Sequence, residues 1–364
     1  MKKIKVNLDK KVSNSYEICV GYDIMDRIGL IIAKNHPAFR YIIVTDSNVS
    51  ALHGEGLLEK LKGMGLKADM IEFPAGEASK NISTALGIVE KMLKIGADRK
   101  STLLALGGGV VGDITGLIAS LYMRSLPYIQ IPTTLMAQVD SSIGGKTAVD
   151  LPEGKNLLGT FHQPRGVFVD LKFLETLSEA EFNNGLIEVI KYGIIEDAGF
   201  FHFLEEHMDR IRKRQSDALE RIVENSCRIK KGIVEIDEKD EGLRRVLNFG
   251  HTIGHAVEAA SEYRMSHGEA VALGMVAAVR ISERLHDLPA EDRVRIERLI
   301  KSAGLSGHIP KTISLEKILS RLKMDKKKDG STIHFVLLRK IGMPFINGGV
   351  PEMVLHDVVE ELRR

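Results

Sequence analysis

The first half of this chain alternates short β-rich runs with amphipathic helical stretches, and this rhythm restricts the fold more than any other feature. The runs expected to form strands are 41–45, 68–73, 102–106, 128–131 and 167–170. Between two of them, Leu86, Val89 and Leu93 recur at helical spacing within a predicted helix over 82–95. Strands and helices that alternate in this way predict a parallel sheet with crossover helices.

After about residue 175 the pattern becomes mainly helical. Helical periodicity is expected at 180–196, 217–235, 251–262, 269–285 and 290–303, and a late strand at 333–338. We therefore predict a Rossmann-like α/β domain over residues 1–175 and a mostly α-helical domain over residues 176–364. No repeat or low-complexity linker separates them, so close packing is expected, and clefts between domains are preferred ligand sites.

Composition excludes several classes of function. The 51 Lys and Arg residues nearly balance the 49 Asp and Glu residues, and no basic stripe is present, so no nucleic-acid partner is expected. No apolar run approaches the ~20 residues of a membrane span, so no membrane partner is expected either. The charged N-terminus lacks the apolar core of a signal peptide, and the only cysteines are Cys19 and Cys227. These features favour a cytoplasmic protein.

A glycine-rich sequence, GGGVVGD at 107–113, follows one predicted strand directly and precedes a helical stretch. Its spacing matches G-x-G-x-x-G, in which glycines let the backbone approach a pyrophosphate at a helix N-terminus. The motif lies later in the chain than in the usual dinucleotide fingerprint. Asp46, at the end of an earlier strand, is the acid that would hold a ribose. The sequence thus favours a nucleotide cofactor, with a structural glycine turn as the alternative.

A second uncharged run contains Thr133 and Thr134 and leads to Gly144-Gly145-Lys146. Threonine hydroxyls after a strand and a Gly-Gly-Lys turn would both donate hydrogen bonds to phosphate or ribose oxygens. A plain loop with hydroxyl caps is the alternative interpretation.

The helical half carries a candidate metal site. His251 and His255 are separated by four residues and therefore share one helix face, and His267 precedes the next predicted helix. On an earlier helix, Glu188 and Lys191 are separated by three residues. Three nitrogen and oxygen ligands with an open position would form a catalytic zinc-type site. The spacing leaves open whether His255 binds the metal or faces a substrate, and structural histidines are the alternative to a metal site.

Four long motifs together resemble those of the 3-dehydroquinate synthase family of sugar phosphate cyclases, and the likeness extends over residues 46–330. The motifs are GGGVVGD, the run at 122–156, GLIEVIKYG at 185–193 and LNFGHTIGHAVE at 247–258. The resemblance implies a Rossmann-like domain followed by a helical domain, with the active site between them. It further implies an NAD cofactor, a divalent metal (zinc or cobalt), a sugar phosphate substrate and a homodimer.

The resemblance also implies roles for individual residues. The metal ligands would be Glu188, His251 and His267, which makes His255 a substrate-facing residue. The NAD contacts would be Asp46, Asn48, Glu77, Lys80, Gly108, Gly109, Asp113, Thr133, Thr134, Asp140, Ser141 and Thr176. The catalytic and substrate-binding residues would be Arg124, Lys146, Lys155, Asn156, Lys191, Lys230, Arg244, Asn248, His255 and Lys326. For the last position, Lys327 is the alternative register.

The family reaction that the resemblance implies converts 3-deoxy-D-arabino-heptulosonate 7-phosphate to 3-dehydroquinate and phosphate, a step of chorismate and aromatic amino acid biosynthesis. NAD is transiently reduced, phosphate leaves by β-elimination, the hydride returns, and an intramolecular aldol closure forms the carbocycle. The metal acidifies the hydroxyl to be oxidised, and cationic side chains stabilise developing charge. The chain would therefore be a carbon–oxygen lyase with a redox cofactor.

Three alternative functions compete with this interpretation. A polyol dehydrogenase on the same scaffold would release NADH and would not need so many anion-binding residues. A cyclase acting on glucose 6-phosphate or sedoheptulose 7-phosphate would not need Arg244, where the resemblance predicts carboxylate binding. A metal-dependent regulator or nucleic-acid module lacks support because no basic stripe is present.

Overall fold

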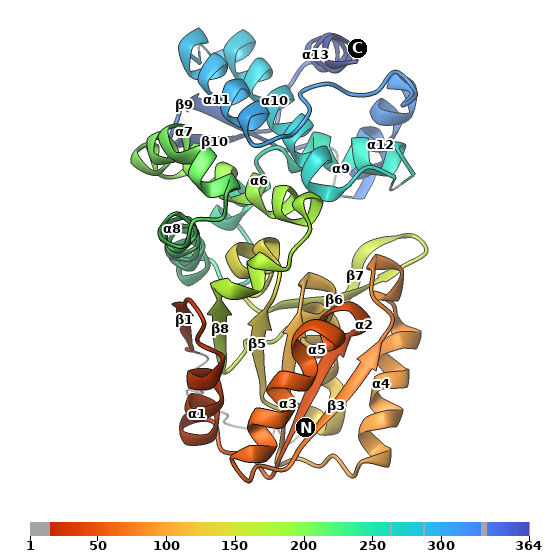
Figure 1. Ribbon diagram of the computed structural model, residues 1–364. Coiled ribbons are helices and arrows are strands. Elements are labelled where there is room, and N and C mark those ends of the chain that lie inside the picture. The colour runs from red at the N-terminus through yellow and green to blue at the C-terminus, as the bar shows by residue number, and fades with distance from the viewer. Residues whose placement is uncertain (1–14, 263, 287, 329–332, 364) are drawn as a thin grey trace, which may run out of the picture.

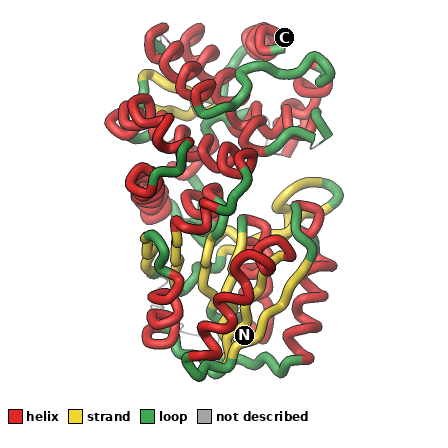
Figure 2. The backbone as a smooth tube through the Cα atoms, viewed as in Figure 1, coloured by secondary structure: helices red, strands yellow, loops and turns green. Residues whose placement is uncertain are grey.

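The computed structural model describes residues 15–262, 264–286, 288–328 and 333–363, with only the backbone described for 324–328. A parallel sheet flanked by helices forms the first part of the chain, and helices dominate the second (Figures 1 and 2). The predicted fold class is therefore confirmed.

The sheet has six strands, all paired in parallel. Across the sheet the order is β1 (Glu17–Gly21), β8 (Gly166–Asp170), β5 (Tyr128–Pro132), β4 (Ser101–Gly107), β2 (Arg40–Asp46) and β3 (Ala68–Phe73). The five predicted strands are all present, each within one residue of its predicted ends. The edge strand β1 was not predicted.

Helices cover both faces of the sheet, which explains why the inner strands are continuously buried. Alternate residues of β2 and β4 enter two different hydrophobic clusters. One cluster lies against α4 (Ile82–Lys94) and α5 (Gly109–Leu121), and the other against α1 (Met25–Asn35) and α3 (Glu55–Gly63).

An antiparallel hairpin of β6 (Lys146–Leu151) and β7 (Gly154–Phe161) stands beside the sheet and was not predicted. It packs along α5, where the Thr160 and Ser120 hydroxyls are 2.9 Å apart. Near its turn, Asp150 pairs with Asn81 in an isolated bridge. In Figure 1 this hairpin extends from the sheet toward the helical part.

The second part of the chain packs around α10, whose residues are buried on nearly all sides. Its elements are α6 (Glu179–Ile195), α7 (Ala198–Arg212), α8 (Ser216–Ile236), α9 (His251–Ala260), α10 (His267–His286), α11 (Ala290–Ser302), α12 (Leu315–Lys328), α13 (Glu352–Leu362), and the antiparallel pair β9 (Phe335–Lys340) and β10 (Met343–Asn347). The five predicted helices are present within two residues at each end, and the predicted late strand is β9.

One hydrophobic cluster joins the two parts of the chain. Val167 and Val169 of β8 belong to the same cluster as Leu186 and Ile187 of α6. The close packing expected from the sequence is therefore present. The boundary at residue 175 stays a prediction. Within the described residues, no helix combines the length and apolar character needed to cross a membrane.

Candidate active site

Helices α9 and α10 approach each other closely at small residues. A Cβ added to Gly274 of α10 would lie 1.8 Å from the carbonyl oxygen of Gly250, and one added to Gly254 would lie 2.9 Å from that of Ala270. Gly250 also has a φ of 78°, a left-handed conformation that favours glycine, at the start of α9. Contact between the two backbones allows the histidines at the beginning of both helices to meet.

The three predicted histidines form a compact group. Ring nitrogens of His251, His255 and His267 all lie within 4.8 Å of one another. Nε2 of His251 also lies 3.6 Å from Oε1 of Glu188 on α6. His255 is the exposed member of the group, whereas His251 and His267 are half-buried.

The carboxylate of Glu188 is the clearest indication of a metal site. It is fully buried, and neither oxygen makes a hydrogen bond with the described residues, although the ammonium of Lys191 forms an ion pair with it. Burying a carboxylate without hydrogen bonds is costly unless other charges compensate. One carboxylate with imidazole nitrogens is a donor set that Zn²⁺ and Co²⁺ accept, so these residues fit a divalent metal.

Burial keeps the His251 imidazole in the form that binds a cation. Burial, with a contribution from the positive charge of Lys191, holds the pKa of His251 well below its ordinary value. His251 is therefore neutral at pH 7, the form of histidine that binds metals.

Glu258, two helical turns after His251, was not predicted as a site residue. Its Oε2 lies 3.3 Å from Nδ1 of His267, and its Oε1 accepts a hydrogen bond of 2.7 Å from Nζ of Lys155. Burial alone would raise the pKa of Glu258, but these two partners outweigh it and lower the pKa to about 2. The side chain is thus an ionised carboxylate between a predicted metal ligand and a predicted substrate contact.

A second network lies beside Lys191 and is centred on Asp140 in η4 (Ala137–Ser141), a π-helical turn after β5. Oδ1 of Asp140 accepts hydrogen bonds of 2.6 Å from the hydroxyl of Tyr192 and from Nζ of Lys230. Burial would raise the pKa of Asp140, but Lys230 and Lys191 outweigh it and hold the pKa well below its usual range. The structure therefore brings Asp140, predicted for NAD, against Lys230, predicted for substrate.

Several residues predicted to contact NAD lie at the carboxyl ends of neighbouring strands. Asp46 ends β2, Gly108 follows β4 and Thr133 follows β5. The chain continues from β2 to β3 on one side and from β4 to β5 on the other, so the strand order reverses between β2 and β4. Ligands of open α/β sheets bind in the crevice at such a reversal.

The glycine-rich turn fits a pyrophosphate at this crevice. Gly108 is the N-cap of α5, and no acidic residue occupies the first turn of that helix, so its backbone amides suit an anion. Gly109 lies close to Ser141, since an added Cβ would be 3.1 Å from the Ser141 hydroxyl. The hydroxyl of Thr133 is buried without a hydrogen-bond partner among the described residues. Such an unpaired buried donor is consistent with a polar ligand at this edge.

The β6–β7 hairpin brings predicted NAD and substrate contacts together. Nζ of Lys80 lies 2.6 Å from both Oδ2 of Asp113 and Oδ1 of Asn156, and Nζ of Lys155 lies 3.5 Å from Oε1 of Glu77. Burial outweighs the attraction of Lys80 and raises the pKa of Asp113 to about 6. These five side chains form one charged group at the carboxyl edge of the sheet.

Other predicted contacts form a more distant group at the far end of the hairpin. Lys146 forms an ion pair with Asp240, and its side chain is half exposed. The guanidinium of Arg244 is buried and donates a hydrogen bond of 2.7 Å to the carbonyl oxygen of Glu238. Asn248 is exposed at the end of η6 (Leu243–Asn248).

Within this chain, Arg124 lies away from the site. It is exposed on η3 (Tyr122–Arg124), between the end of α5 and the start of β5, which places it at the opposite edge of the sheet from Gly108. Lys326 lies on α12, but its side chain is outside the described residues, so its register with Lys327 stays a prediction.

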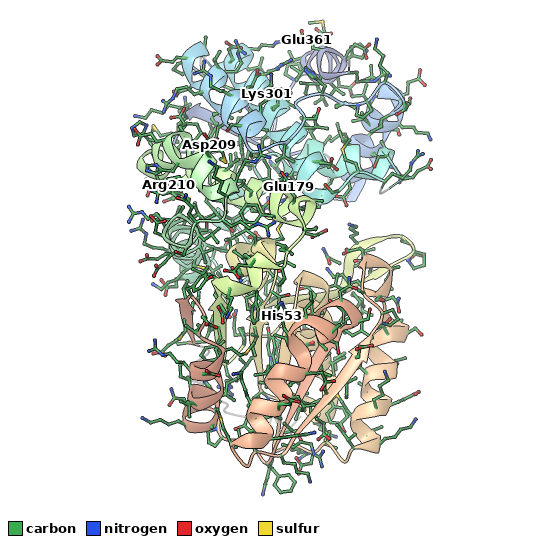
Figure 3. All side chains as sticks on the ribbon, viewed as in Figure 1. His53, Glu179, Asp209, Arg210, Lys301 and Glu361 are labelled. Carbon is green, nitrogen blue, oxygen red and sulfur yellow. The ribbon has the colours of Figure 1, made fainter. Side chains whose placement is uncertain are left out.

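The remaining predicted NAD contacts lie near the same crevice. The backbone amide of Asn48 donates a 2.9 Å hydrogen bond to Oδ1 of Asp46, and Thr134 follows Thr133. The hydroxyl of Thr176 lies 3.0 Å from Nε2 of His53, which was not predicted as a site residue. His53 lies on η1 (Ser50–Gly54), at the end of the sheet that faces the helical part (Figure 3).

Three side chains at this site were not predicted, and they differ in whether the sequence contains a signal for them. Glu258 continues the spacing of His251 and His255 along one face of α9, so helical periodicity could have found it. Tyr192 stands inside GLIEVIKYG next to Lys191. His53 has no motif, because only the folded chain brings it to Thr176.

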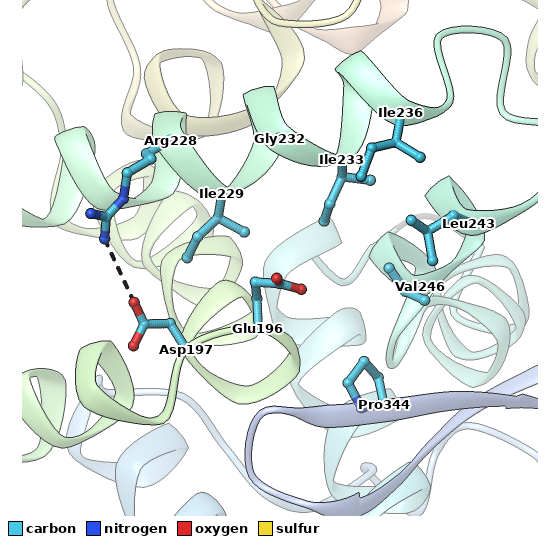
Figure 4. Close-up of a pocket in the computed structure, with 10 residues that line it drawn as sticks. All are labelled: Glu196, Asp197, Arg228, Ile229, Gly232, Ile233, Ile236, Leu243, Val246 and Pro344. Carbon is cyan, nitrogen blue, oxygen red and sulfur yellow. Dashed lines mark ion pairs between the residues drawn. The ribbon is translucent and has the colours of Figure 1, made fainter.

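A pocket of about 530 Å³ lies elsewhere, between α8, η6 and the end of α6 (Figure 4). Its lining combines apolar side chains with one ion pair, in which Arg228 and Asp197 are 3.6 Å apart. None of the predicted site residues lines it. The candidate active site is therefore defined by the polar clusters above.

Comparisons with known proteins agree with these observations. The family model described as 3-dehydroquinate synthase N-terminal matches residues 70–184, and the one described as 3-dehydroquinate synthase C-terminal matches residues 185–328. The chain is 47% identical over 319 residues to the 3-dehydroquinate synthase of Acidithiobacillus ferrooxidans, covering 87% of each chain. It is 43% identical to that of Desulforamulus reducens, over 98% of this chain and 99% of the relative.

Solved structures of sugar phosphate cyclases share the fold. A 2-epi-5-epi-valiolone synthase from Streptomyces hygroscopicus, solved with NAD⁺ and Zn²⁺, has a TM-score of 0.90 and 29% identity over 99% of both chains. A 2-deoxy-scyllo-inosose synthase, solved with carbaglucose-6-phosphate, NAD⁺ and Co²⁺, has a TM-score of 0.85 and 28% identity over 94% of this chain and 96% of the other. The two family models and the curated relatives together show that this chain is an enzyme of the 3-dehydroquinate synthase family.

Proposed function

We propose that this chain converts 3-deoxy-D-arabino-heptulosonate 7-phosphate to 3-dehydroquinate and phosphate. The observation that carries the proposal is the buried Glu188 carboxylate, which makes an ion pair with Lys191 but no hydrogen bond among the described residues, and which lies 3.6 Å from His251 in a group of three histidines. The curated relatives named 3-dehydroquinate synthase, at 42–47% identity, support the same reaction.

Glu188, His251 and His267 would hold a divalent zinc or cobalt ion, and His255 would face the substrate. The exposure of His255, in contrast to its two half-buried neighbours, supports this division. A metal with three protein ligands keeps a position for substrate hydroxyls and lowers the pKa of the one to be oxidised. NAD⁺ and Zn²⁺ or Co²⁺ in the related cyclase structures support the same pair of cofactors here.

The crevice at the carboxyl ends of β2 and β4 would hold NAD, which accepts a hydride from the substrate and later returns it. Asp46 would contact the ribose, and the backbone around Gly108 and Gly109 would bind the pyrophosphate. The proximity of the sheet edge to the helical part supports a nicotinamide near the metal, because Lys155 joins β7 directly to Glu258 of α9.

The cationic side chains would bind the phosphate and carboxylate of the substrate and stabilise charge as phosphate leaves. Lys191 and Lys230 are nearly fully buried, so their charges act with little screening by water. Oδ1 of Asp140 accepts hydrogen bonds from the hydroxyl of Tyr192 and from the ammonium of Lys230, and the carboxylate thus holds that ammonium in place.

The position of Arg124 supports a homodimer. Its predicted role as a substrate contact cannot be performed within this chain, because it lies at the opposite edge of the sheet. A second copy would therefore have to supply it. Sedimentation of the purified protein tests this proposal, and a monomer at concentrations that give full activity would refute it.

A phosphate-release assay tests the proposed reaction. Purified protein with NAD and Zn²⁺ should release phosphate from 3-deoxy-D-arabino-heptulosonate 7-phosphate without net accumulation of NADH. Steady NADH production would instead indicate a dehydrogenase, and turnover of glucose 6-phosphate or sedoheptulose 7-phosphate alone would indicate another cyclase.

Location and remaining partners follow from composition. The balanced charge supports the absence of a nucleic-acid partner, and two cysteines, of which Cys227 is buried, suit a reducing cytoplasm. Fractionation of cells and a nucleic-acid binding assay at physiological salt would test these two expectations.

A further inference from the structure

Glu258 lies between the proposed metal site and the proposed substrate site. It follows His251 by seven residues and His255 by three, so all three share one face of α9. Only 5% of its side chain is exposed. We propose that Glu258 is a positioning residue that fixes the metal-binding ring of His267 and, through its other oxygen, places Lys155 beside the metal. This inference rests on the proposed metal site.

The contact with His267 determines the tautomer and the orientation of that ring. Oε2 of Glu258 lies 3.3 Å from Nδ1 of His267. The ammonium of Lys155 donates to the same carboxylate, which therefore acts as the acceptor, and Nδ1 carries the hydrogen of this contact. The lone pair that can bind a metal is then on Nε2. A carboxylate that fixes the tautomer and orientation of a ligating histidine in this way also raises its basicity.

The contact with Lys155 connects helix α9 of the helical part to the β6–β7 hairpin beside the sheet. Nζ of Lys155, on β7, donates a 2.7 Å hydrogen bond to Oε1 of Glu258, on α9. The two oxygens of one carboxylate therefore serve one residue of the hairpin and one residue of α10. The side chain of Lys155 is only one-third exposed, and its ammonium is held against the carboxylate that also contacts His267.

An ordinary buried ion pair would produce a different outcome on mutation. If Glu258 only stabilised the fold, its loss would lower the free energy of unfolding and leave the affinity of the folded protein for metal unchanged. A positioning role predicts a loss of metal affinity in the folded protein. The free amide nitrogen of a glutamine can turn toward Nδ1 and favour the wrong tautomer.

Metal affinity measured without substrate separates these cases. Metal-free Glu258→Gln should bind Zn²⁺ about 10- to 100-fold more weakly than the wild type in competition with a chromophoric chelator. Glu220→Gln, an exposed change on α8, should bind like the wild type. Lys155→Met removes the second contact, together with the ion pair to Glu77, but leaves the Glu258–His267 contact in place. Its Zn²⁺ affinity should therefore stay within about three-fold of wild type while the KM for the sugar phosphate rises.

Two results would overturn the proposal. One is a Zn²⁺ affinity of folded Glu258→Gln within about two-fold of wild type, and the other is an equal loss in Glu220→Gln. If the wild type itself binds no Zn²⁺, the proposed function fails as well, so the two failures are distinguishable.

A measurement on the unmutated protein keeps the test independent of folding defects. Long-range ¹H–¹⁵N spectra of histidine-labelled, metal-free protein at about pH 8, where imidazole is neutral, report which ring nitrogen carries the proton. His267, assigned by its absence in His267→Gln, should be protonated at Nδ1. Protonation at Nε2 would contradict the proposal.

Discussion

At the carboxyl ends of β4 and β5 the proposed site for the NAD pyrophosphate is made mostly of backbone and small side chains, whereas the helical part lines the proposed metal site with buried ionisable groups. Gly108, Gly109 and Thr133 carry no charge. Glu188, Lys191 and Lys230 are all nearly inaccessible to solvent. The glycine turn thus offers shape and backbone amides, whereas the metal site offers buried charges.

The difference has a physical consequence. A backbone site built from glycine leaves few unsatisfied groups when its ligand is absent, because each amide can bind water. Buried charges must compensate one another before any ligand arrives, as Glu188 does for Lys191 and Asp140 does for Lys230. Substitutions in the helical region should therefore affect both folding and binding, and those at the glycine turn mainly binding.

The largest effect is expected for Glu188→Gln. The buried ammonium of Lys191 would lose its counter-charge, so the free energy of unfolding of metal-free protein should fall by about 3 kcal/mol. Zn²⁺ affinity should fall by more than about 100-fold, since even residues that only orient ligands contribute 10- to 100-fold. Denaturant unfolding with a chelator and Zn²⁺ titration measure the two effects. Unchanged values for both would remove Glu188 from the metal site.

Asp113 should give the sheet region a distinct pH dependence. Burial raises its folded pKa from 3.8 to about 6, so the folded state holds a proton that the unfolded state releases earlier. Its contribution to stability is complete below pH 3.8 and is lost as the pH rises through about 6. Two pKa units correspond to about 3 kcal/mol. Asp113→Asn should lack this loss, so the difference in stability between wild type and variant, measured by denaturant unfolding at each pH, should change between about pH 4 and about pH 7. A difference that does not change between pH 4 and pH 7 would contradict the assignment.

Gly109→Ala tests the backbone character of the NAD site. The new methyl would lie 3.1 Å from the Ser141 hydroxyl and would narrow the approach of a pyrophosphate. The KM for NAD should rise about 10-fold, equivalent to about 1.4 kcal/mol, with Zn²⁺ affinity unchanged. Gly87→Ala on α4 is the matched control, because a Cβ there meets nothing within 4 Å. A parallel loss of Zn²⁺ affinity in Gly109→Ala would contradict the separation of the two sites.

The parts of the fold that the sequence predicted share a physical property. Strands β2, β4, β5 and β8 are buried on both faces and therefore appear as continuous apolar runs. Strand β1 is only half-buried at the sheet edge, and its partner β8 is distant in sequence, so local pattern gave no signal. In the β6–β7 hairpin, β7 is largely exposed and contains glycine and polar residues, so it lacks the continuous apolar run of the inner strands.

The candidate site divides in the same way. Helical spacing predicts that His251 and His255 share a face, because that relation is local. The meeting of Glu188, His267 and Lys155 with this pair depends on helix crossings and on the hairpin, which no local pattern contains. Their predicted roles came from the family motifs, and the bridging position of Glu258 came only from the structure.

The smallest effect is expected at the first residue of the helix that carries Glu188. Glu179 forms a 2.8 Å ion pair with Arg212, but 71% of its side chain is exposed, and Figure 3 labels it at the surface of the helical part. Water already solvates both partners, so Glu179→Gln should cost less than about 1 kcal/mol, with Zn²⁺ affinity unchanged. The loss should shrink further at about 1 M salt, which screens exposed charges. Glu179→Gln and Glu188→Gln are the same substitution at two positions of α6, nine residues apart. Comparing their losses of unfolding free energy therefore measures the contribution of burial. A loss at Glu179 equal to that at Glu188 would show that helix α6 responds to any loss of negative charge, and that the buried carboxylate has no special role.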